Sequence, residues 1–275
     1  MNLIANRSRA IDSRNDPAIK RIRRLHAREE RTHTGLYYVE GLRFVVQALR
    51  HHAKIETLVV CPPLLTHPSA ASLVRRQRRA GTPVLEVTPD VLYSLALVDD
   101  PQGLGAVVRQ RWEPLSHVAP GDELCWLVHD VVRSPGNLGA ILRTSEAVGG
   151  AGVILLGDAI DPYDPAVARS TMGTVFAQRF VRTGVDDFVR WRRTHGYYLA
   201  GTSPAAATDY HEMAYPAPTL LLMGGERKGL SPELRELCDT LVRIPMVGDV
   251  DSLNLAVATG VMLYELFNQR RSAVS

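Results

Sequence analysis

The stretch from Leu220 to Pro232, Leu-Leu-Leu-Met-Gly-Gly-Glu-Arg-Lys-Gly-Leu-Ser-Pro, passes from an apolar run into a glycine-rich loop and then into a helix start. The apolar run predicts a strand that is buried on both faces, which is typical of parallel sheets. Ser231 and Pro232 are typical of the first turn of a helix. The stretch therefore predicts a strand–loop–helix unit of an α/β fold, whose loop lies where such sheets bind ligands.

Further apolar strands and helices alternate around this stretch. Strands are expected at 124–129, 152–156, 197–200 and 241–244, and helices at 137–148, 185–193, 232–238 and 252–268. Near-continuous apolar strands between helices indicate a mostly parallel sheet that is covered on both faces.

The chain before position 110 shows a separate alternation. A basic helix is expected from Asn15-Asp16-Pro17 to about Arg31. Strands at 37–40, 57–60, 83–87 and 104–109, with helices at 41–49, 70–79 and 89–96, predict a second α/β unit. Residues 110–122 contain two prolines and a glycine and little periodicity. We therefore expect an N-terminal domain at 1–111, a linker at 112–122 and a C-terminal domain at 123–275.

Composition excludes several classes of protein. The 275 residues are 45% apolar, and the formal net charge is 32 − 29 = +3. The three cysteines, Cys61, Cys125 and Cys238, contain no C-x-x-C pair and argue against disulfides and zinc. Histidine spacing suggests no metal site, and no apolar run approaches the ~20 residues of a membrane span. We expect a soluble cytoplasmic protein without a metal.

Basic residues are concentrated in two places. Residues 1–31 hold nine Lys or Arg against four Asp or Glu. Arg75, Arg76, Arg78 and Arg79 form a second cluster. Such clusters suit phosphate contacts, but solvated helix faces explain each of them equally well.

Two more segments begin at the ends of predicted strands. In the segment from Asp130 to Arg143, Asn137 is expected to be the N-cap of a helix, and Arg143 lies six residues further on. In the segment from Ile244 to Asn254, Ser252 is expected to cap the last helix, with Asn254 in its first turn. Each segment alone is compatible with an ordinary strand–turn–helix unit. Neither the P-loop pattern nor G-x-G-x-x-G is present, which argues against a nucleotide-dependent oxidoreductase.

In this order, the segments resemble the three motifs of the SpoU (TrmH-like) branch of the SPOUT methyltransferases. The motif N-x-G-A-I-x-R is matched by Asn137, Gly139, Ala140, Ile141 and Arg143. The motif G-[NS]-E-x-x-G-[LI]-S is matched by Gly224, Glu226, Gly229, Leu230 and Ser231. The motif I-P-M-x-G-x-x-x-S-L-N is matched by 244–248 and 252–254. The resemblance covers residues 124 to about 268.

Shorter matches and two departures accompany these motifs. Arg169, Ser170 and Gly173 resemble the substrate-side R-x-S-x-G segment of the family. Residues 38–41, Tyr-Val-Glu-Gly, resemble the family's substrate-binding domain, which is similar to ribosomal protein L30e. Gly225 stands where many relatives have Asn or Ser, and Ala256 where Ser is frequent.

The resemblance implies a C-terminal trefoil-knotted methyltransferase domain, an N-terminal L30e-like domain and a homodimer. It implies that S-adenosylmethionine is held by Met223, Gly224, Gly225, Ile244, Met246 and Leu253. It also implies that Arg143 activates a ribose 2′-hydroxyl, as a base or by orienting it, inside a polar shell of Asn137, Glu226, Ser252 and Asn254. RNA contacts are expected from Arg21, Arg23, Arg24, Arg169 and Ser170.

The expected function is therefore S-adenosylmethionine-dependent 2′-O-methylation of RNA. Ribosomal RNA, in particular 23S RNA, is the expected substrate because the additional N-terminal domain is typical of the ribosomal RNA members. Two alternatives remain: a transfer RNA ribose 2′-O-methyltransferase, or an L30e-related RNA-binding protein whose C-terminal half is inactive.

Overall fold

The computed structural model describes residues 10–274, which divide into two units. The N-terminal unit contains the described residues up to Gln110 together with the segment Pro162–Phe176. The C-terminal unit contains Arg111–Asp161 and the described residues from Ala177 onward. Arg7 and Arg9, which belong to the basic N-terminal stretch, lie outside the described residues.

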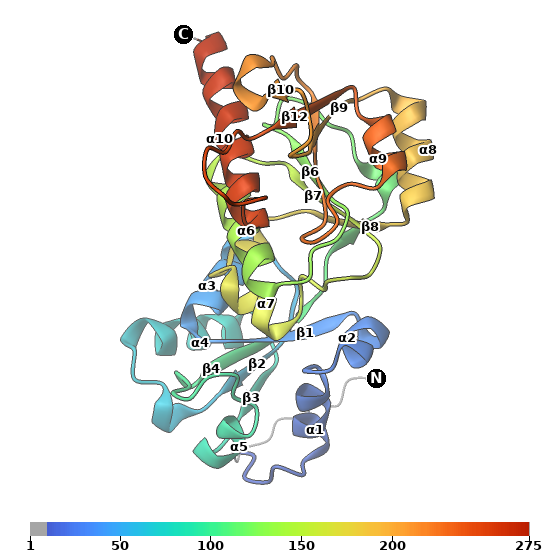
Figure 1. Cartoon of the computed structure of the whole chain (residues 1–275). Coiled ribbons are helices and arrows are strands. Elements are labelled where there is room, and N and C mark those ends of the chain that lie inside the picture. Colours follow the sequence, from blue (N-terminus) through green and yellow to red (C-terminus); the bar gives the residue numbers. More distant parts are fainter. Residues whose placement is uncertain (1–9, 275) are drawn as a thin grey trace. The chain divides into compact units, whose positions relative to one another are not determined.

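The N-terminal unit is built on a four-stranded sheet with the order β1-β4-β2-β3 (Figure 1). Strand β4 runs antiparallel to both β1 and β2, whereas β3 runs parallel to β2. The strands are β1 (Leu36–Glu40), β2 (Ile55–Val60), β3 (Val84–Glu86) and β4 (Leu104–Arg109). The helices are α1 (Pro17–Arg24), α2 (Arg28–Thr34), α3 (Leu42–Arg50), α4 (Pro68–Arg79), α5 (Pro89–Tyr93) and α7 (Pro165–Ser170).

The basic N-terminal helix differs from the prediction. A single helix to about Arg31 was wrong, because α1 ends at Arg24 and the backbone of Ala27 is extended before α2 begins. The break turns the buried Arg31 side chain back toward α1. Its guanidinium donates to the carbonyls of Leu25 and His26 at 3.0 and 2.8 Å. These bonds satisfy carbonyl groups that the end of the helix leaves without an intrahelical partner.

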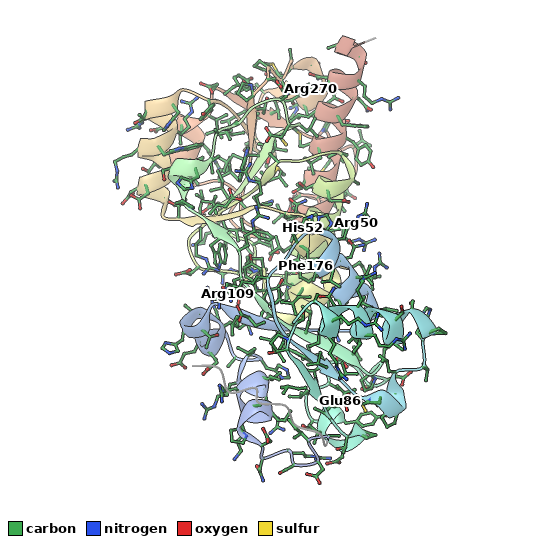
Figure 2. The ribbon with its side chains drawn as sticks, turned by 180° about the vertical axis from the view of Figure 1, so that it is seen from behind. Arg50, His52, Glu86, Arg109, Phe176 and Arg270 are labelled. Carbon is green, nitrogen blue, oxygen red and sulfur yellow. The ribbon has the colours of Figure 1, made fainter. Side chains whose placement is uncertain are left out.

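The segment Pro162–Phe176 was expected in the C-terminal domain but packs with the N-terminal unit. The ring of Tyr163 lies 4.7 Å from that of Tyr37, and Phe176 lies 6.3 Å from the same ring (Figure 2). Asp164 forms an ion pair with the buried Arg31 at 3.1 Å. Aromatic burial and this ion pair therefore attach the connection between two strands of the C-terminal unit to the N-terminal unit.

The C-terminal unit contains an eight-stranded, wholly parallel sheet with the order β10-β12-β9-β11-β6-β7-β8-β5. This architecture confirms the α/β class with a parallel sheet. The strands are β5 (Trp112–Glu113), β6 (Trp126–His129), β7 (Gly152–Leu156), β8 (Phe180–Thr183), β9 (Tyr198–Thr202), β10 (Thr208–Asp209), β11 (Thr219–Met223) and β12 (Thr240–Arg243). The helices are α6 (Pro135–Ala147), α8 (Val185–His195), α9 (Pro232–Leu237) and α10 (Leu255–Val274).

Residues 112–122, expected to be a linker, instead form part of this unit. Strand β5 pairs with β8 at the edge of the sheet, and Val118 is buried in the core. Arg179 holds Glu113 through both of its carboxylate oxygens at 2.8–3.0 Å. The prolines, Pro114 and Pro120, therefore follow a short edge strand and do not mark a separate linker.

Helices cover both faces of the parallel sheet (Figure 1). Helices α8 and α9 pack on the face that carries Trp126 and Val128. Because side chains alternate along a strand, Leu127 and His129 point to the other face, where α6 and α10 lie side by side. Among residues 10–274, no helix combines the length and the apolar character needed to cross a membrane.

Candidate active site

Three loops begin at the carboxyl edge of the parallel sheet, at the ends of strands that are neighbours or next-but-one neighbours. Strands β6 and β11 are direct neighbours, with His129 opposite Met223 at their ends. Strand β12 lies two positions from β11, with β9 between them. Since all strands run in the same direction, the loops after β6, β11 and β12 start at the same edge, which is the usual ligand site of an open α/β sheet.

The loop after β6 ends in α6, whose cap is not the predicted residue. The Ser134 side chain caps the helix by accepting from the Asn137 amide nitrogen at 3.4 Å. Asn137 lies at the third helical position, so its carboxamide is not used as a cap. It remains available for contacts with the other two loops.

The carboxamide of Asn137 joins all three loops. Its Nδ2 donates to Glu226 Oε1 at 2.7 Å, and its Oδ1 accepts from Asn254 Nδ2 at 3.0 Å. Glu226 also accepts from the backbone amide of Ser134 at 3.1 Å. We call Asn137, Glu226 and Asn254 the amide–carboxylate cluster. These predicted site residues, 89 and 117 positions apart in sequence, therefore meet at one point of the sheet edge.

Asn254 also begins the last helix. Its Oδ1 accepts from the backbone amides of Ala256 and Val257 at 2.9 and 3.3 Å, as an N-cap does. Ser252, expected to be the cap and part of the polar shell, is exposed and has no hydrogen-bond partner among the described residues. The cap therefore lies two residues later than predicted, and it fixes the direction in which Asn254 donates to Asn137.

The electrostatic environment keeps Glu226 ionised. Partial burial would raise the pKa of its carboxyl group. The hydrogen bonds from Asn137 and from the backbone of Ser134 and Arg133, together with the Arg133 charge, outweigh burial and lower this pKa. A carboxylate that accepts several hydrogen bonds is a positioning group rather than a proton acceptor at neutral pH.

Arg143 is not brought to this cluster within the chain. It lies six residues after Asn137 on α6, which places it about 9 Å further along the axis and about 240° around it. Its side chain is exposed and has no ion-pair or hydrogen-bond partner in residues 10–274. Its guanidinium is therefore available to an external group.

The glycine-rich loop after β11 folds back on itself. Gly225 and Gly229 exchange two backbone hydrogen bonds, both of 3.1 Å, across the three residues between them. A Cβ atom at Gly224 would lie 2.6 Å from the backbone of Gly229, so no side chain fits there. At Gly225 it would lie 3.2 Å from the Val131 side chain. The loop is therefore a narrow backbone cradle beside the carboxyl end of β11.

The loop after β12 exposes apolar side chains. Ile244 and Met246 are half-buried, whereas Val247, Val250 and Leu253 are exposed. Exposed apolar groups that gather on one loop are typical of a ligand or partner site. Met223 is buried, and its sulfur accepts a hydrogen bond from Thr202. The predicted cofactor residues therefore differ in burial: Met223 is buried, Leu253 is exposed, and the other four, Gly224, Gly225, Ile244 and Met246, are half-buried.

Two groups at the end of β6 were not predicted as site residues. His129 is 1% exposed, and neither ring nitrogen has a hydrogen-bond partner among the described residues. Burial lowers the pKa of His129 to about 4. Asp130 is half-buried, and burial raises the pKa of its carboxyl group. Their position at the end of an apolar strand is the signal in the sequence that could have identified them.

The residues expected to bind RNA have different surroundings. Arg21 and Arg24 are exposed on α1. Arg23 is instead bonded to Ser94, through its backbone carbonyl at 3.2 Å and its hydroxyl at 2.8 Å. On α7, Arg169 donates to the Leu97 carbonyl at 2.6 Å, and the Ser170 hydroxyl donates to the carbonyl of Val167. Arg23 and Arg169 therefore already stabilise the N-terminal unit.

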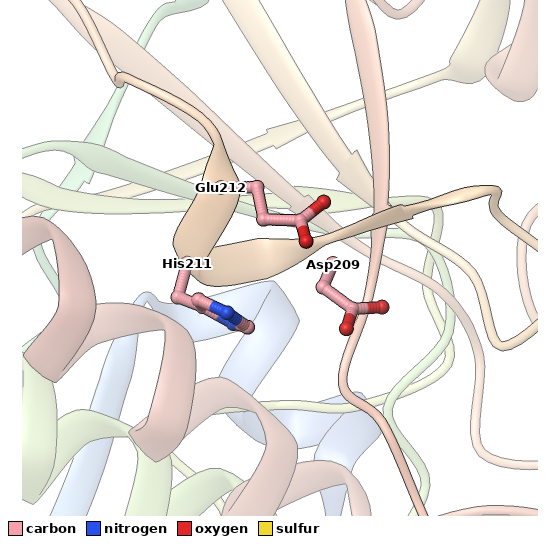
Figure 3. A group of neighbouring side chains, drawn as sticks. All are labelled: Asp209, His211 and Glu212. Atoms are coloured by element: carbon pink, nitrogen blue, oxygen red, sulfur yellow. The ribbon is translucent and has the colours of Figure 1, made fainter.

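One group of potential metal ligands lies beside the start of the loop after β12, because Asp209 of β10 is paired with Arg243 at the end of β12. Among the described residues, only Asp209, His211 and Glu212 bring three ligating atoms within 4.8 Å of one another (Figure 3). The Asp209 carboxylate accepts from Arg243 at 2.5 Å. A cation bound here would be repelled by this guanidinium. We therefore interpret the group as the Asp209–Arg243 ion pair with two exposed side chains, His211 and Glu212, beside it.

Comparisons with known proteins agree with these motifs. Residues 125–264 match the model of the SpoU rRNA Methylase family, and residues 16–106 match that of the MRM3-like substrate binding domain. The 23S rRNA (uridine(2479)-2′-O)-methyltransferase of Streptomyces viridochromogenes is 35% identical over 89% of this chain and 87% of the relative. The 23S rRNA (guanosine-2′-O-)-methyltransferase RlmB of Pseudomonas syringae pv. tomato is 35% identical over 84% of this chain and 95% of the relative.

A solved structure extends the similarity to the whole fold. The AdoMet-bound rRNA methyltransferase from Sinorhizobium meliloti superposes with a TM-score of 0.87 and 38% identity, and the match covers 97% of this chain and 99% of that one. The family model, the relatives and the shared fold lead to one conclusion: the chain belongs to the SpoU rRNA methylase family.

Proposed function

We propose that this protein transfers the methyl group of S-adenosylmethionine to a ribose 2′-hydroxyl of ribosomal RNA. The observation that carries the proposal is the amide–carboxylate cluster, in which Asn137, Glu226 and Asn254 each come from a different motif of the family. The cluster holds three loops together at the sheet edge where an α/β protein binds its ligand.

The residues around the cluster suit S-adenosylmethionine. The glycine cradle at 224–229 leaves no room for a Cβ atom at Gly224 and offers backbone groups to the polar parts of the cofactor. The apolar side chains of Ile244, Met246 and Leu253 offer a surface for its adenine and thioether parts. The relative of known structure from Sinorhizobium meliloti binds AdoMet with the same fold. When bound, the cofactor supplies a methyl group on a positively charged sulfur.

Arg143 is the group that we place beside the RNA. Transfer forms a bond between the ribose oxygen and the methyl carbon, breaks the bond from that carbon to sulfur and releases the hydroxyl proton. A guanidinium stays charged at any physiological pH, so we assign Arg143 to orienting the hydroxyl and the neighbouring phosphate. The amide–carboxylate cluster positions the cofactor loops, and correct alignment of oxygen, methyl and sulfur supplies much of the rate.

The names of the relatives support ribose over base as the target. One relative is named for a uridine and another for a guanosine, yet both names specify the 2′-O position of 23S rRNA. The 2′-hydroxyl is the one acceptor that these substrates share and that DNA lacks. We therefore propose 23S ribosomal RNA, in the cytoplasm, as the substrate of this chain. The match of the N-terminal unit to a substrate binding domain supports the same choice.

Three finer features complete the proposal. A trefoil knot is supported by the loop after β12, which must pass the ends of β9 and β11 to reach α6 at Asn137. A homodimer, with each site near the interface, is supported by α10, where Val257 and Tyr264 are exposed seven residues apart on one face. An L30e-like N-terminal unit is supported by its small mixed sheet covered by helices.

Light scattering tests the proposed dimer, because Tyr264→Glu should produce monomers.

The experiment that tests the proposed function supplies labelled S-adenosylmethionine with transcribed 23S ribosomal RNA or with transcribed transfer RNA. Nucleoside analysis of each RNA follows. We expect a 2′-O-methylated nucleoside in the 23S RNA. Label in transfer RNA alone would favour the transfer RNA alternative. Absence of both transfer and cofactor binding would favour an RNA-binding protein whose C-terminal unit is inactive.

A further inference from the structure

Helix α4 of the N-terminal unit presents a stripe of arginine side chains. Arg75, Arg76 and Arg79 are exposed, whereas Leu73 and Val74 are buried beneath them. At about 100° per residue, the three arginines lie within about 100° of arc, on the side of the helix away from the buried residues. We call Arg75, Arg76 and Arg79 the α4 stripe.

The fourth arginine of this helix differs from the stripe. Arg78 forms an ion pair at 2.6 Å with Glu86 of β3. The three arginines of the stripe have no acidic or hydrogen-bonding partner among residues 10–274. The helix thus separates one arginine that stabilises the unit from three that have no structural use.

The sequence around the stripe contains no compensating charge. Residues 57–85 include no Asp or Glu, whereas they include all four arginines of the helix. Basic residues in the last turn of a helix also interact favourably with the helix dipole, but one or two such residues are enough for this effect. The excess of unpaired positive charge therefore indicates an anionic partner.

The basic helix α1, which the sequence favours as the RNA contact, is a weaker candidate. Arg14 is paired with Asp90, and Arg23 is bonded to Ser94. A groove next to α1 is lined by Arg24 but also by Glu29 and Glu30. Although Arg21 and Arg24 are exposed, acidic side chains therefore lie beside the basic ones on this side of the unit.

We propose that the α4 stripe is the main phosphate-binding surface of the N-terminal unit and holds the backbone of the RNA substrate. This inference rests on the proposed function, because it takes RNA as the substrate. Arginine suits the role, since its fork of donors matches phosphate oxygens and it remains charged at any physiological pH. Such contacts add affinity without reading the sequence of the RNA.

The test measures how the affinity of the full-length protein for transcribed 23S ribosomal RNA depends on salt. Each phosphate contact adds about 0.7–0.9 to the slope of log affinity against log salt concentration. The triple variant Arg75→Ala, Arg76→Ala, Arg79→Ala should lose about 2 to 3 from this slope. When salt is raised from 50 to 200 mM, both proteins lose affinity. The factor lost by the unmodified protein should be about 20–40 times the factor lost by the triple variant.

The matched control is a pair of single variants on the same helix. Arg79→Ala and Arg78→Ala each remove one arginine, but only Arg79 belongs to the stripe. Arg79→Ala should lower the slope by about one contact, and Arg78→Ala should leave it unchanged. A variant with lysine at all three stripe positions should keep most of the slope, because the charge remains.

The results separate this inference from the proposed function. If the unmodified protein neither binds nor methylates 23S RNA, the proposed function fails and the inference fails with it. If the protein methylates this RNA while the triple variant keeps the full slope, the α4 stripe alone is wrong. An equal loss of slope in Arg78→Ala and Arg79→Ala would also overturn it. Unchanged cofactor affinity of the triple variant shows that the C-terminal unit is intact.

Discussion

Helix α6 carries two predicted site residues, Asn137 and Arg143, in opposite situations. In its first turn, Asn137 uses both ends of its carboxamide, one to Glu226 at 2.7 Å and the other to Asn254 at 3.0 Å. Nearly two turns later, Arg143 is exposed and bonded to no described residue. One helix thus presents a polar group that bonds to two other loops and another that bonds to nothing among the described residues.

This difference separates positioning from chemistry. Asn137 is held by bonds that join three loops, so a substitution at this position disturbs the loops themselves. Arg143 loses nothing when it binds an RNA phosphate or hydroxyl. We therefore expect changes at Asn137 to act through the shape of the site, and changes at Arg143 to act on the reaction itself.

The largest effect on activity is expected at Arg143, which has no partner among the described residues. Arg143→Ala should lower the single-turnover rate of methyl transfer by about 10³-fold, a loss typical of removing one donor that stabilises a transition state. Cofactor affinity and the melting temperature should change little, because the side chain stabilises nothing in the chain. Glu146→Ala, which removes another exposed charge of α6, is the control. Comparable activity in both variants would contradict the role of Arg143.

His129 differs from both Asn137 and Arg143, because it is buried and neither of its ring nitrogens has a hydrogen-bond partner among the described residues. Burial lowers the pKa of His129 to about 4, from 6.5 in the unfolded chain. The unfolded state therefore binds more protons between these values, so stability is full above pH 6.5 and is lost as the pH falls toward 4. At pH 4.5 this loss amounts to about 2 kcal/mol relative to pH 7.

The variant His129→Leu should remove this acid sensitivity and also relieve the two unpartnered nitrogens. Urea unfolding at pH 7 and at pH 4.5 measures the difference. His211→Leu, which removes an exposed histidine, should leave the acid sensitivity in place. Equal loss of stability at low pH in His129→Leu and in the unmodified protein would show that another group is responsible.

A smaller effect on activity is expected at Asn137, whose carboxamide is bonded to Glu226 and Asn254. Asn137→Asp places a second carboxylate against Glu226 and removes the donor between them. Displacement of the loops by about 1 Å would lower kcat/KM by about 100-fold, and unlike Arg143→Ala it should weaken cofactor binding as well. Adding Glu226→Gln restores a donor on the opposite side and should recover part of the loss. A variant with unimpaired cofactor binding would argue against the positioning role.

The smallest effect distinguishes the two candidate caps of α10. Asn254→Ala removes the bonds to Ala256 and Val257 and also the bond to Asn137, and should cost at least about 1 kcal/mol of stability. Ser252→Ala should cost almost nothing, because its side chain has no described partner. Chemical denaturation of both variants measures the difference. A larger loss in Ser252→Ala would restore the cap that the sequence favours.

The order of strands and helices could be predicted because local signals were strong. Apolar runs such as Leu220–Met223 form buried strands, and Asp16-Pro17 begins α1. The boundaries between units could not be predicted. Pro162–Phe176 joins the N-terminal unit through the contacts of Tyr163 and Asp164 with Tyr37 and Arg31. These contacts join residues more than 120 positions apart, and no local pattern encodes them.

The members of the site were predictable, but their geometry was not. The motifs identified Asn137, Glu226 and Asn254, which the structure brings together. The helix caps moved to Ser134 and Asn254, because caps depend on the exact residue at which a helix begins. Arg143 was expected inside the polar shell, yet helical geometry places it on another side of α6.

The central claim is that this protein methylates a ribose oxygen and that Arg143 takes part. The most direct measurement exposes 23S ribosomal RNA to labelled S-adenosylmethionine with the unmodified protein or with Arg143→Ala, and then hydrolyses the RNA in alkali. Alkaline cleavage requires a free 2′-hydroxyl, so a methylated ribose protects the bond that follows it. We predict label in alkali-resistant dinucleotides with the unmodified protein, and almost none with the variant. Label in ordinary mononucleotides, or equal label with both proteins, would contradict the claim.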